Sequence, residues 1–239
     1  MIAMITTSAS PKFSQQVLAE FGVFPLKGIL CIGLVSAGAA AFGLLFWQKD
    51  MWGLGYALAV VIVLGWFGVL YATASTMLDV RPSVLGLAKF LLTLAAMGVP
   101  IGLAVFLTIL GVKNSIPAAF LSGGLLLLGG MALIALLPAW PITQAVSQTW
   151  VGPMNALRAT KGHRGGLIFV ALLLGAFNRL IPSIDTTASF TAACVMAVVG
   201  AIGSVAWAMA FVSISVASSK LMSRNLAANQ LGQSKTRAN

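Results

Sequence analysis

Six long apolar stretches, separated by short polar segments, make up most of the chain. They lie near residues 26–47, 53–75, 86–111, 116–138, 166–184 and 189–217. A helix of about 20 apolar residues crosses the ~30 Å hydrocarbon core of a bilayer. Because the backbone must satisfy its own hydrogen bonds there, helices are favoured, and alternating strands of about ten residues are absent. The pattern predicts an all-α, polytopic membrane protein with six transmembrane helices and short interfacial amphipathic helices.

The charged residues lie almost entirely between these stretches. The 239 residues include 14 Lys and Arg but only 4 Asp and Glu. If the N-terminus is cytoplasmic, all the basic residues fall on the cytoplasmic side except Lys49, Lys113 and Arg179. This bias predicts that both termini are cytoplasmic. The net charge of +10 then follows from topology. No nucleic-acid partner is expected, because the basic residues are spread over loops.

The two polar ends predict three segments along the chain. Residues 1–25 form an N-terminal cytoplasmic interfacial segment, 26–217 the membrane domain, and 218–239 a basic polar tail that is flexible beyond about Leu231. Ser10 is expected to cap a surface helix on which Phe13, Val17 and Phe21 recur. That helix either contacts a partner or, more simply, anchors the first span.

Targeting and cysteine usage add two expectations. Residues 1–25 are too polar for a cleavable signal peptide, so the first membrane helix is expected to act as an uncleaved signal. Cys31 and Cys194 each lie alone within an apolar stretch. They are expected to be small packed side chains, with no disulfide, metal or cofactor.

The longest polar connection is the amphipathic loop 139–165. Ile142, Val146 and Trp150 recur on one helical face, and Thr143 and Gln144 lie on another. This pattern predicts a helix on the membrane surface, or a bent continuation of the fourth span.

A second short helix is expected at 154–161, before the chain re-enters the membrane. It would direct Arg158 and Lys161 toward anionic lipid headgroups. His163 and Arg164 follow at the same level. The loop is therefore expected to lie along the cytoplasmic membrane surface.

One part of the chain resembles a known family. The order ALIALLPAWPITQAVSQTWVGPMNALRATKGHRGGLIFVALLL, residues 132–174, is similar to YciC-like bacterial inner-membrane proteins and to the membrane domain attached to some glycerophosphodiester phosphodiesterases. The similarity extends weakly to 72–98, and it departs at Gly165 and Gly166, where the family often has a bulky residue. The resemblance implies a six-helix fold in a bacterial inner membrane and little about activity.

Residues that carry chemistry are few and scattered. Glu20, Asp50, Asp79 and Asp185 are far apart, and His163 is the only histidine. No HExxH, GxSxG or aspartate-rich motif is present. No enzymatic activity is therefore expected. No charge relay is expected either, because Lys27, Lys89 and Arg179 lie near span ends, where snorkelling explains them.

Small residues are frequent inside the predicted spans. Gly98 and Gly102 flank Pro100, and Gly200, Gly203 and Ser204 follow one another in the last span. Such residues let helices approach closely, either within the chain or against a partner. Pro100 predicts a kink that is a hinge, a lipid-sized cleft or only packing.

The sequence favours a non-catalytic accessory, assembly or stabilising subunit of a larger membrane complex. The alternative is a small transporter or permease subunit for an apolar or lipid-like substrate, with a cavity near Gly98 to Gly102. Expected partners are the headgroups of the cytoplasmic face and other membrane proteins. The residues predicted to contact them are Gly98, Pro100, Gly102, Ile142, Val146, Trp150, Arg158, Lys161, His163, Arg164, Gly200 and Ser204.

Overall fold

The computed structural model describes residues 13–46, 53–184 and 189–238. Within these ranges, only the backbone is described for residue 54 and for residues 226–238. Along these ranges the helices are α1 (Phe13–Gly22), α2 (Leu26–Leu45), α3 (Leu54–Met77), α4 (Val84–Lys113), α5 (Pro117–Leu136), α6 (Trp140–Val146), α7 (Pro153–Ala159), the 3₁₀ helix η1 (Lys161–His163), α8 (Arg164–Leu180) and α9 (Phe190–Ala238). The described residues form no strand, so the all-α fold class is confirmed. The expected Ser10 cap lies outside the described residues.

Five of the described helices are long and apolar enough to cross a membrane. They are Leu26–Leu45, Gly55–Met77, Val84–Lys113, Pro117–Leu136 and Phe190–Asn225. Large apolar side chains such as Leu34 and Leu125 remain more than two-thirds exposed, at 74% and 72%. Surfaces of this kind are covered by lipid in a membrane protein. The chain is therefore a multi-pass membrane protein. The stretch predicted as the fifth span forms α8, which has 17 residues and is not among the five.

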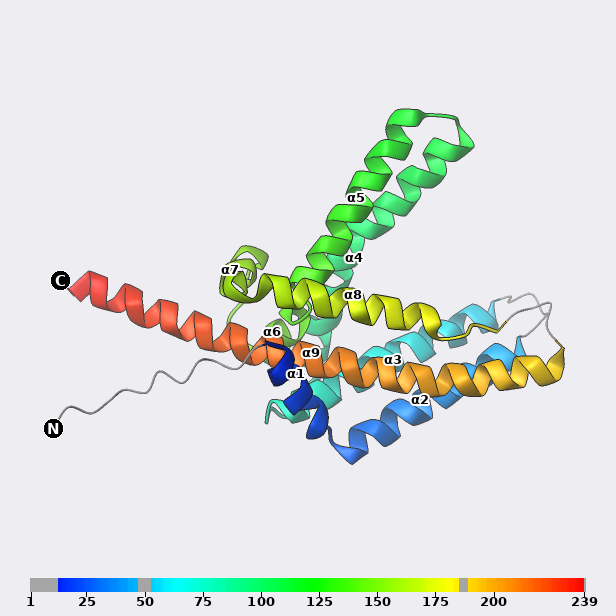
Figure 1. The fold of residues 1–239 in the computed structure, drawn as a ribbon, viewed down its shortest axis with the longest axis horizontal. Helices are drawn as coiled ribbons and strands as arrows, with labels where there is room; N and C mark the ends of the chain where they lie inside the picture. Colours follow the sequence, from blue (N-terminus) through cyan, green and yellow to red (C-terminus); the bar gives the residue numbers. More distant parts are fainter. Residues whose placement is uncertain (1–12, 47–52, 185–188, 239) are drawn as a thin grey trace.

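Helices α2, α3 and α9 form the main bundle, with α2 packed against both of the others (Figure 1). Gly28 permits the close approach of α2 and α3, because a β-carbon there would lie 2.6 Å from Thr73 Cγ2. Ile32, Leu70 and Val212 are buried in the core that these helices share. The three helices thus form one packed body.

Helices α4 and α5 form an antiparallel hairpin that leans away from this bundle (Figure 1). Glycines allow the two helices to pack closely. A β-carbon on Gly111 would lie 2.5 Å from the Phe120 backbone nitrogen, and one on Gly123 would overlap Thr108. Helix α4 continues as a single helix through Pro100. Most of the hairpin's outer surface is uncovered by the rest of the chain.

Residues 212–222 of α9 pass through a shell of α1, α6 and α7, which we call the collar. Every residue from 212 to 219 is buried, and so is Met222. Glu20 of α1 accepts a hydrogen bond from Lys220 Nζ at 2.7 Å. Helix α9 therefore continues through the boundary expected at 217 and on past Leu231. The segment contains no proline and many helix-favouring residues.

Helix α6 is buried on both of the faces that the sequence distinguishes. Residues 140–145 are all buried, and the helix ends at Val146, before Trp150. Thr143 Oγ1 donates to Ser219 Oγ at 3.0 Å, and Gln144 Oε1 accepts from the Val151 backbone N–H at 2.8 Å. Polar side chains can be buried when they have such partners. The polar face of α6 that carries Thr143 and Gln144 is therefore buried together with its apolar face.

Candidate functional site

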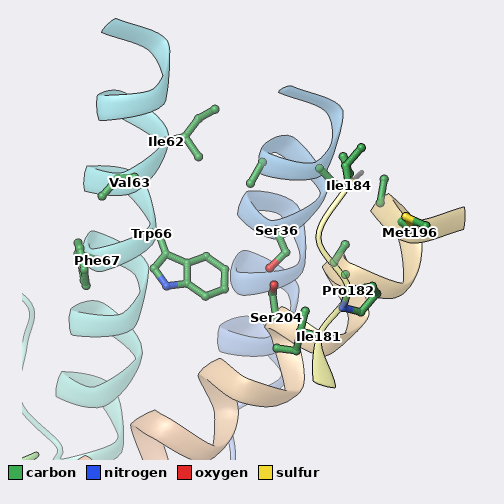
Figure 2. Close-up of a pocket in the computed structure, with 15 residues that line it drawn as sticks. Ser36, Ile62, Val63, Trp66, Phe67, Ile181, Pro182, Ile184, Met196 and Ser204 are labelled. Atoms are coloured by element: carbon green, nitrogen blue, oxygen red, sulfur yellow. The ribbon is translucent and has the colours of Figure 1, made fainter. Parts of the chain in front are cut away.

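A cavity of about 440 Å³ lies between α2, α3 and α9 (Figure 2). This is within the range of roughly 300–1,000 Å³ for small-molecule sites. Its lining consists of Ser36, Ala39, Ala40, Ile62, Val63, Trp66, Phe67, Ile181, Pro182, Ile184, Met196, Ala197, Gly200, Ala201 and Ser204. The cavity is partly open to the outside and lies near the middle of α2.

The space exists because small residues on two helices face large ones on the third. Ser36, Ala39 and Ala40 follow the three- and four-residue spacing of one face of α2. On α9 the same spacing brings together Ala197, Gly200 and other small residues. Trp66 of α3 extends across toward them (Figure 2). The small side chains leave a gap that neither α2 nor α9 fills.

One wall of the cavity is formed by residues 181–184, which follow α8 and are not helical. Ile181 packs on Gly203, and the Pro182 carbonyl oxygen lies against Gly200. Ile184 packs on Gly43 of α2. Non-helical backbone at membrane depth is tolerated where it is buried in protein or lines a cavity. The second condition is met here, because Ile181, Pro182 and Ile184 line the cavity, although none of residues 181–184 is fully buried.

The cavity has little polar character. Ser36 Oγ donates to the Ile32 carbonyl of its own helix at 2.8 Å, so the Ser36 hydroxyl hydrogen is not available to a molecule in the cavity. Ser204 and the Trp66 indole are the other polar groups of the lining. No acidic or basic residue lines it, and the described residues contain no group of three potential metal ligands. The lining therefore suits an apolar chain.

Arg179 lies beside this wall, two residues before Ile181. Arg179 lies in the last turn of α8, near the end of that helix as the sequence predicts. Because Ile181 contacts Gly203, which is ~20 Å along α9 from Phe190, this end of α8 lies about midway along the bundle. The Arg179 side chain is exposed. A charged side chain inside a membrane protein generally faces water or a counter-charge.

Two of the predicted contact residues, Gly200 and Ser204, line the cavity. The others from the spans do not. Nothing lies within 4 Å of a β-carbon built on Gly98 or Gly102, so these glycines pack against no other helix in the described structure. Pro100 instead packs near Gly130 of α5. Gly98, Pro100 and Gly102 do not line the cavity described above, so that cavity is not the one expected near Gly98 to Gly102.

The predicted residues of the amphipathic loop are dispersed by the collar. Ile142 is buried in the core, Val146 is half-buried and Trp150 is 60% exposed. Arg158 and Lys161 are exposed. These five residues do not converge on a common site.

The last two loop residues contact their own neighbourhood. His163 packs edge-on to Phe13, with ring centroids 6.5 Å apart. Arg164 donates from Nη2 to the Leu157 carbonyl at 2.9 Å. These contacts fix the turn between α7 and α8.

A second pocket of about 230 Å³ lies at the collar. It brings Glu20, Asp79 and Lys220 together, although they are far apart in sequence. Lys220 already pairs with Glu20. His163 and Arg164 do not line this pocket. The arrangement is a paired carboxylate at a helix junction, with Asp79 nearby in a turn of positive φ (57°).

Sequence reasoning missed Ser36, Trp66 and the segment 181–184. Two signals were present: the small-residue run from Ser36 to Ala40, and Pro182 near the end of an apolar stretch. The residue before a proline is disfavoured in helix, which is consistent with α8 ending at Leu180.

Comparison with known proteins adds no assignment: no family model, curated protein or solved structure matches the chain.

Proposed function

We propose that the protein binds the apolar chain of a lipid-like molecule in the α2–α3–α9 cavity, as a small transporter or carrier subunit of the membrane. The observation that carries this proposal is the apolar, partly open cavity at the middle of α2, closed on one side by non-helical chain. Burial of apolar surface would drive binding, at roughly 25 cal/mol per Å².

In this proposal the chain crosses the membrane six times, and only part of the fifth crossing is helical. Helix α8 begins beside the collar, where Leu167 packs with Phe13 and Ala217. It ends beside Gly203, and residues 181–184 continue past Gly200. The positive-inside bias supports a cytoplasmic collar and cytoplasmic termini. The resemblance to YciC-like proteins supports a bacterial inner membrane, and the absence of a catalytic motif supports a non-enzymatic role.

An accessory role in a larger complex is the second candidate. It is favoured by the α4–α5 hairpin, which leans away from the bundle and leaves Gly98 and Gly102 open. Small residues of this kind accept a neighbouring helix. Purification in mild detergent from native membranes tests this candidate. A defined protein that co-purifies, and is lost in Gly98→Leu but not in Gly175→Leu on α8, would support it.

Photocrosslinking tests the binding proposal. The probe is a sixteen-carbon fatty alcohol with a mid-chain diazirine, incorporated into vesicles that contain the purified protein. Cross-links are expected on the lining residues of α3 and α9. Ala40→Phe, which fills the cavity, should reduce them about tenfold relative to cross-links on the exposed face of α4. Ala37→Phe is the matched control, because Ala37 is exposed and does not line the cavity.

Equal labelling of the lining in the wild type and in both variants would overturn the proposal. So would labelling of the lining no stronger than that of the α4 face.

A further inference from the structure

Arg179 is a cation without a partner in the part of the chain that the structure describes. Its guanidinium makes no hydrogen bond or ion pair there, and the side chain is exposed. The other described basic side chains lie near the collar, at helix ends, or at the hairpin tip. Lys89 Nζ, for example, donates to the Ser147 carbonyl at 3.1 Å. Arg179 therefore differs from them in its depth along the bundle, whereas several of the others, such as Lys27 and Arg158, are also without a partner among the described residues.

No described carboxylate can neutralise Arg179. Glu20 is paired with Lys220 at the collar, and Asp79 lines the same pocket as that pair. Asp50 and Asp185 lie outside the described residues. A guanidinium at this depth favours an anion nearby.

The position of Arg179 links this charge to the cavity. Ile181 and Pro182, two and three residues later, form part of the cavity lining. A molecule whose chain occupies the cavity and emerges past these residues would bring its polar end near the guanidinium. Guanidinium groups bind phosphate through two parallel hydrogen bonds.

We propose that the molecule held in the cavity is a membrane phospholipid whose phosphate pairs with Arg179 while one acyl chain occupies the space between α2, α3 and α9. This inference rests on the proposed function and narrows its ligand class. The source is the surrounding bilayer, which supplies both the chain and the phosphate. Arg179 thereby holds a phosphate near the middle of the bundle, well below the level at which headgroups normally lie.

The test compares two lipids with identical chains, each carrying a mid-chain diazirine. One is phosphatidylglycerol, and the other is diacylglycerol, which lacks the phosphate. Both are incorporated at equal, low mole fraction into vesicles containing the full-length protein, and cross-links on the cavity lining are quantified. The wild type should label with phosphatidylglycerol about tenfold more than with diacylglycerol.

Substitutions assign this preference to Arg179. Arg179→Gln should reduce the preference to within about twofold, by lowering phosphatidylglycerol labelling alone, and Arg179→Lys should retain part of it. Lys113→Gln, at the hairpin tip, is the matched control and should leave it unchanged. Inorganic phosphate added at about 10 mM should not compete, because it has no chain to occupy the cavity.

The outcomes separate this inference from the function on which it rests. If neither lipid labels the lining, the proposed function fails. If both lipids label the lining equally, and Arg179→Gln does not change either cross-link yield, the cavity binds lipid without a contribution from the phosphate, and this inference is overturned. Pairing of Arg179 with Asp185 is the competing account, and it predicts that second result.

Discussion

The Pro182 carbonyl oxygen lies so close to Gly200 that a β-carbon on Gly200 would approach it to 2.9 Å. This contact holds the non-helical segment after α8 against α9, where it forms a wall of the cavity. The glycine is therefore required by a close approach between two segments of the chain. A larger residue must push the wall away or distort α9.

Gly200→Val should lower the free energy of unfolding by about 1–3 kcal/mol, because an enlarged side chain in a packed contact forces a backbone shift. Thermal unfolding in detergent, followed by intrinsic fluorescence, measures this change. Gly98→Val is the matched control, because a β-carbon on Gly98 meets nothing within 4 Å. Equal losses in both variants would show that Gly200 is an ordinary helical glycine.

Gln144 gives a second prediction, on the collar. Its Oε1 accepts the Val151 N–H at 2.8 Å in a fully buried position. Gln144→Ala should cost about 1–3 kcal/mol, because the Val151 N–H is left buried without a partner. Gln148→Ala, at an exposed position, should change stability by less than about 0.5 kcal/mol. Equal changes of stability in the two variants would contradict the assignment of Gln144 as a buried acceptor.

The Glu20–Lys220 pair is expected to contribute little. The Lys220 side chain is 40% exposed, so solvent screens the 2.7 Å contact. A double-mutant cycle with Glu20→Gln and Lys220→Met should give a coupling of less than about 1 kcal/mol, which falls further in 1 M salt. A coupling of several kcal/mol, insensitive to salt, would mean that the pair is shielded from solvent by a partner or by lipid.

Cysteine labelling tests the proposed orientation and the fifth crossing together. In a variant without Cys31 and Cys194, a single cysteine is placed at Gly165, before most of α8, or at Ser189, at the start of α9. Both positions are exposed. A membrane-impermeant maleimide should label the Ser189→Cys protein in intact cells and the Gly165→Cys protein only after permeabilisation. Labelling of both cysteines from the same side of the membrane would show that the chain does not cross the membrane between residues 165 and 189.

The membrane-spanning helices were largely predictable, because the bilayer demands long apolar runs and the sequence contains them. Helices α2 to α5 begin and end within a few residues of the predicted stretches. Helix α8 differs, since hydropathy continues to about residue 184 while the helix ends at Leu180, before Pro182. An apolar run shows that a segment prefers lipid or protein to water, and it does not show where its backbone stops being helical.

The site was predicted only in part. Gly200 and Ser204 were identified as a small-residue face, but the cavity depends on Trp66 of another helix meeting that face, which no spacing within one helix reveals. Gln144 shows the converse problem. Its place on the polar face of the predicted helix does not reveal its partner, because Val151, seven residues later in the chain, folds back to supply the backbone N–H.

Native mass spectrometry of the protein released from its own membranes in mild detergent tests the central claim most directly. The account predicts one retained lipid mass on the wild-type protein and on Ala37→Phe, and its loss in Ala40→Phe, because only the last variant fills the cavity. Retention of the same lipid mass by all three proteins, or no retained lipid on any of them, would contradict the account.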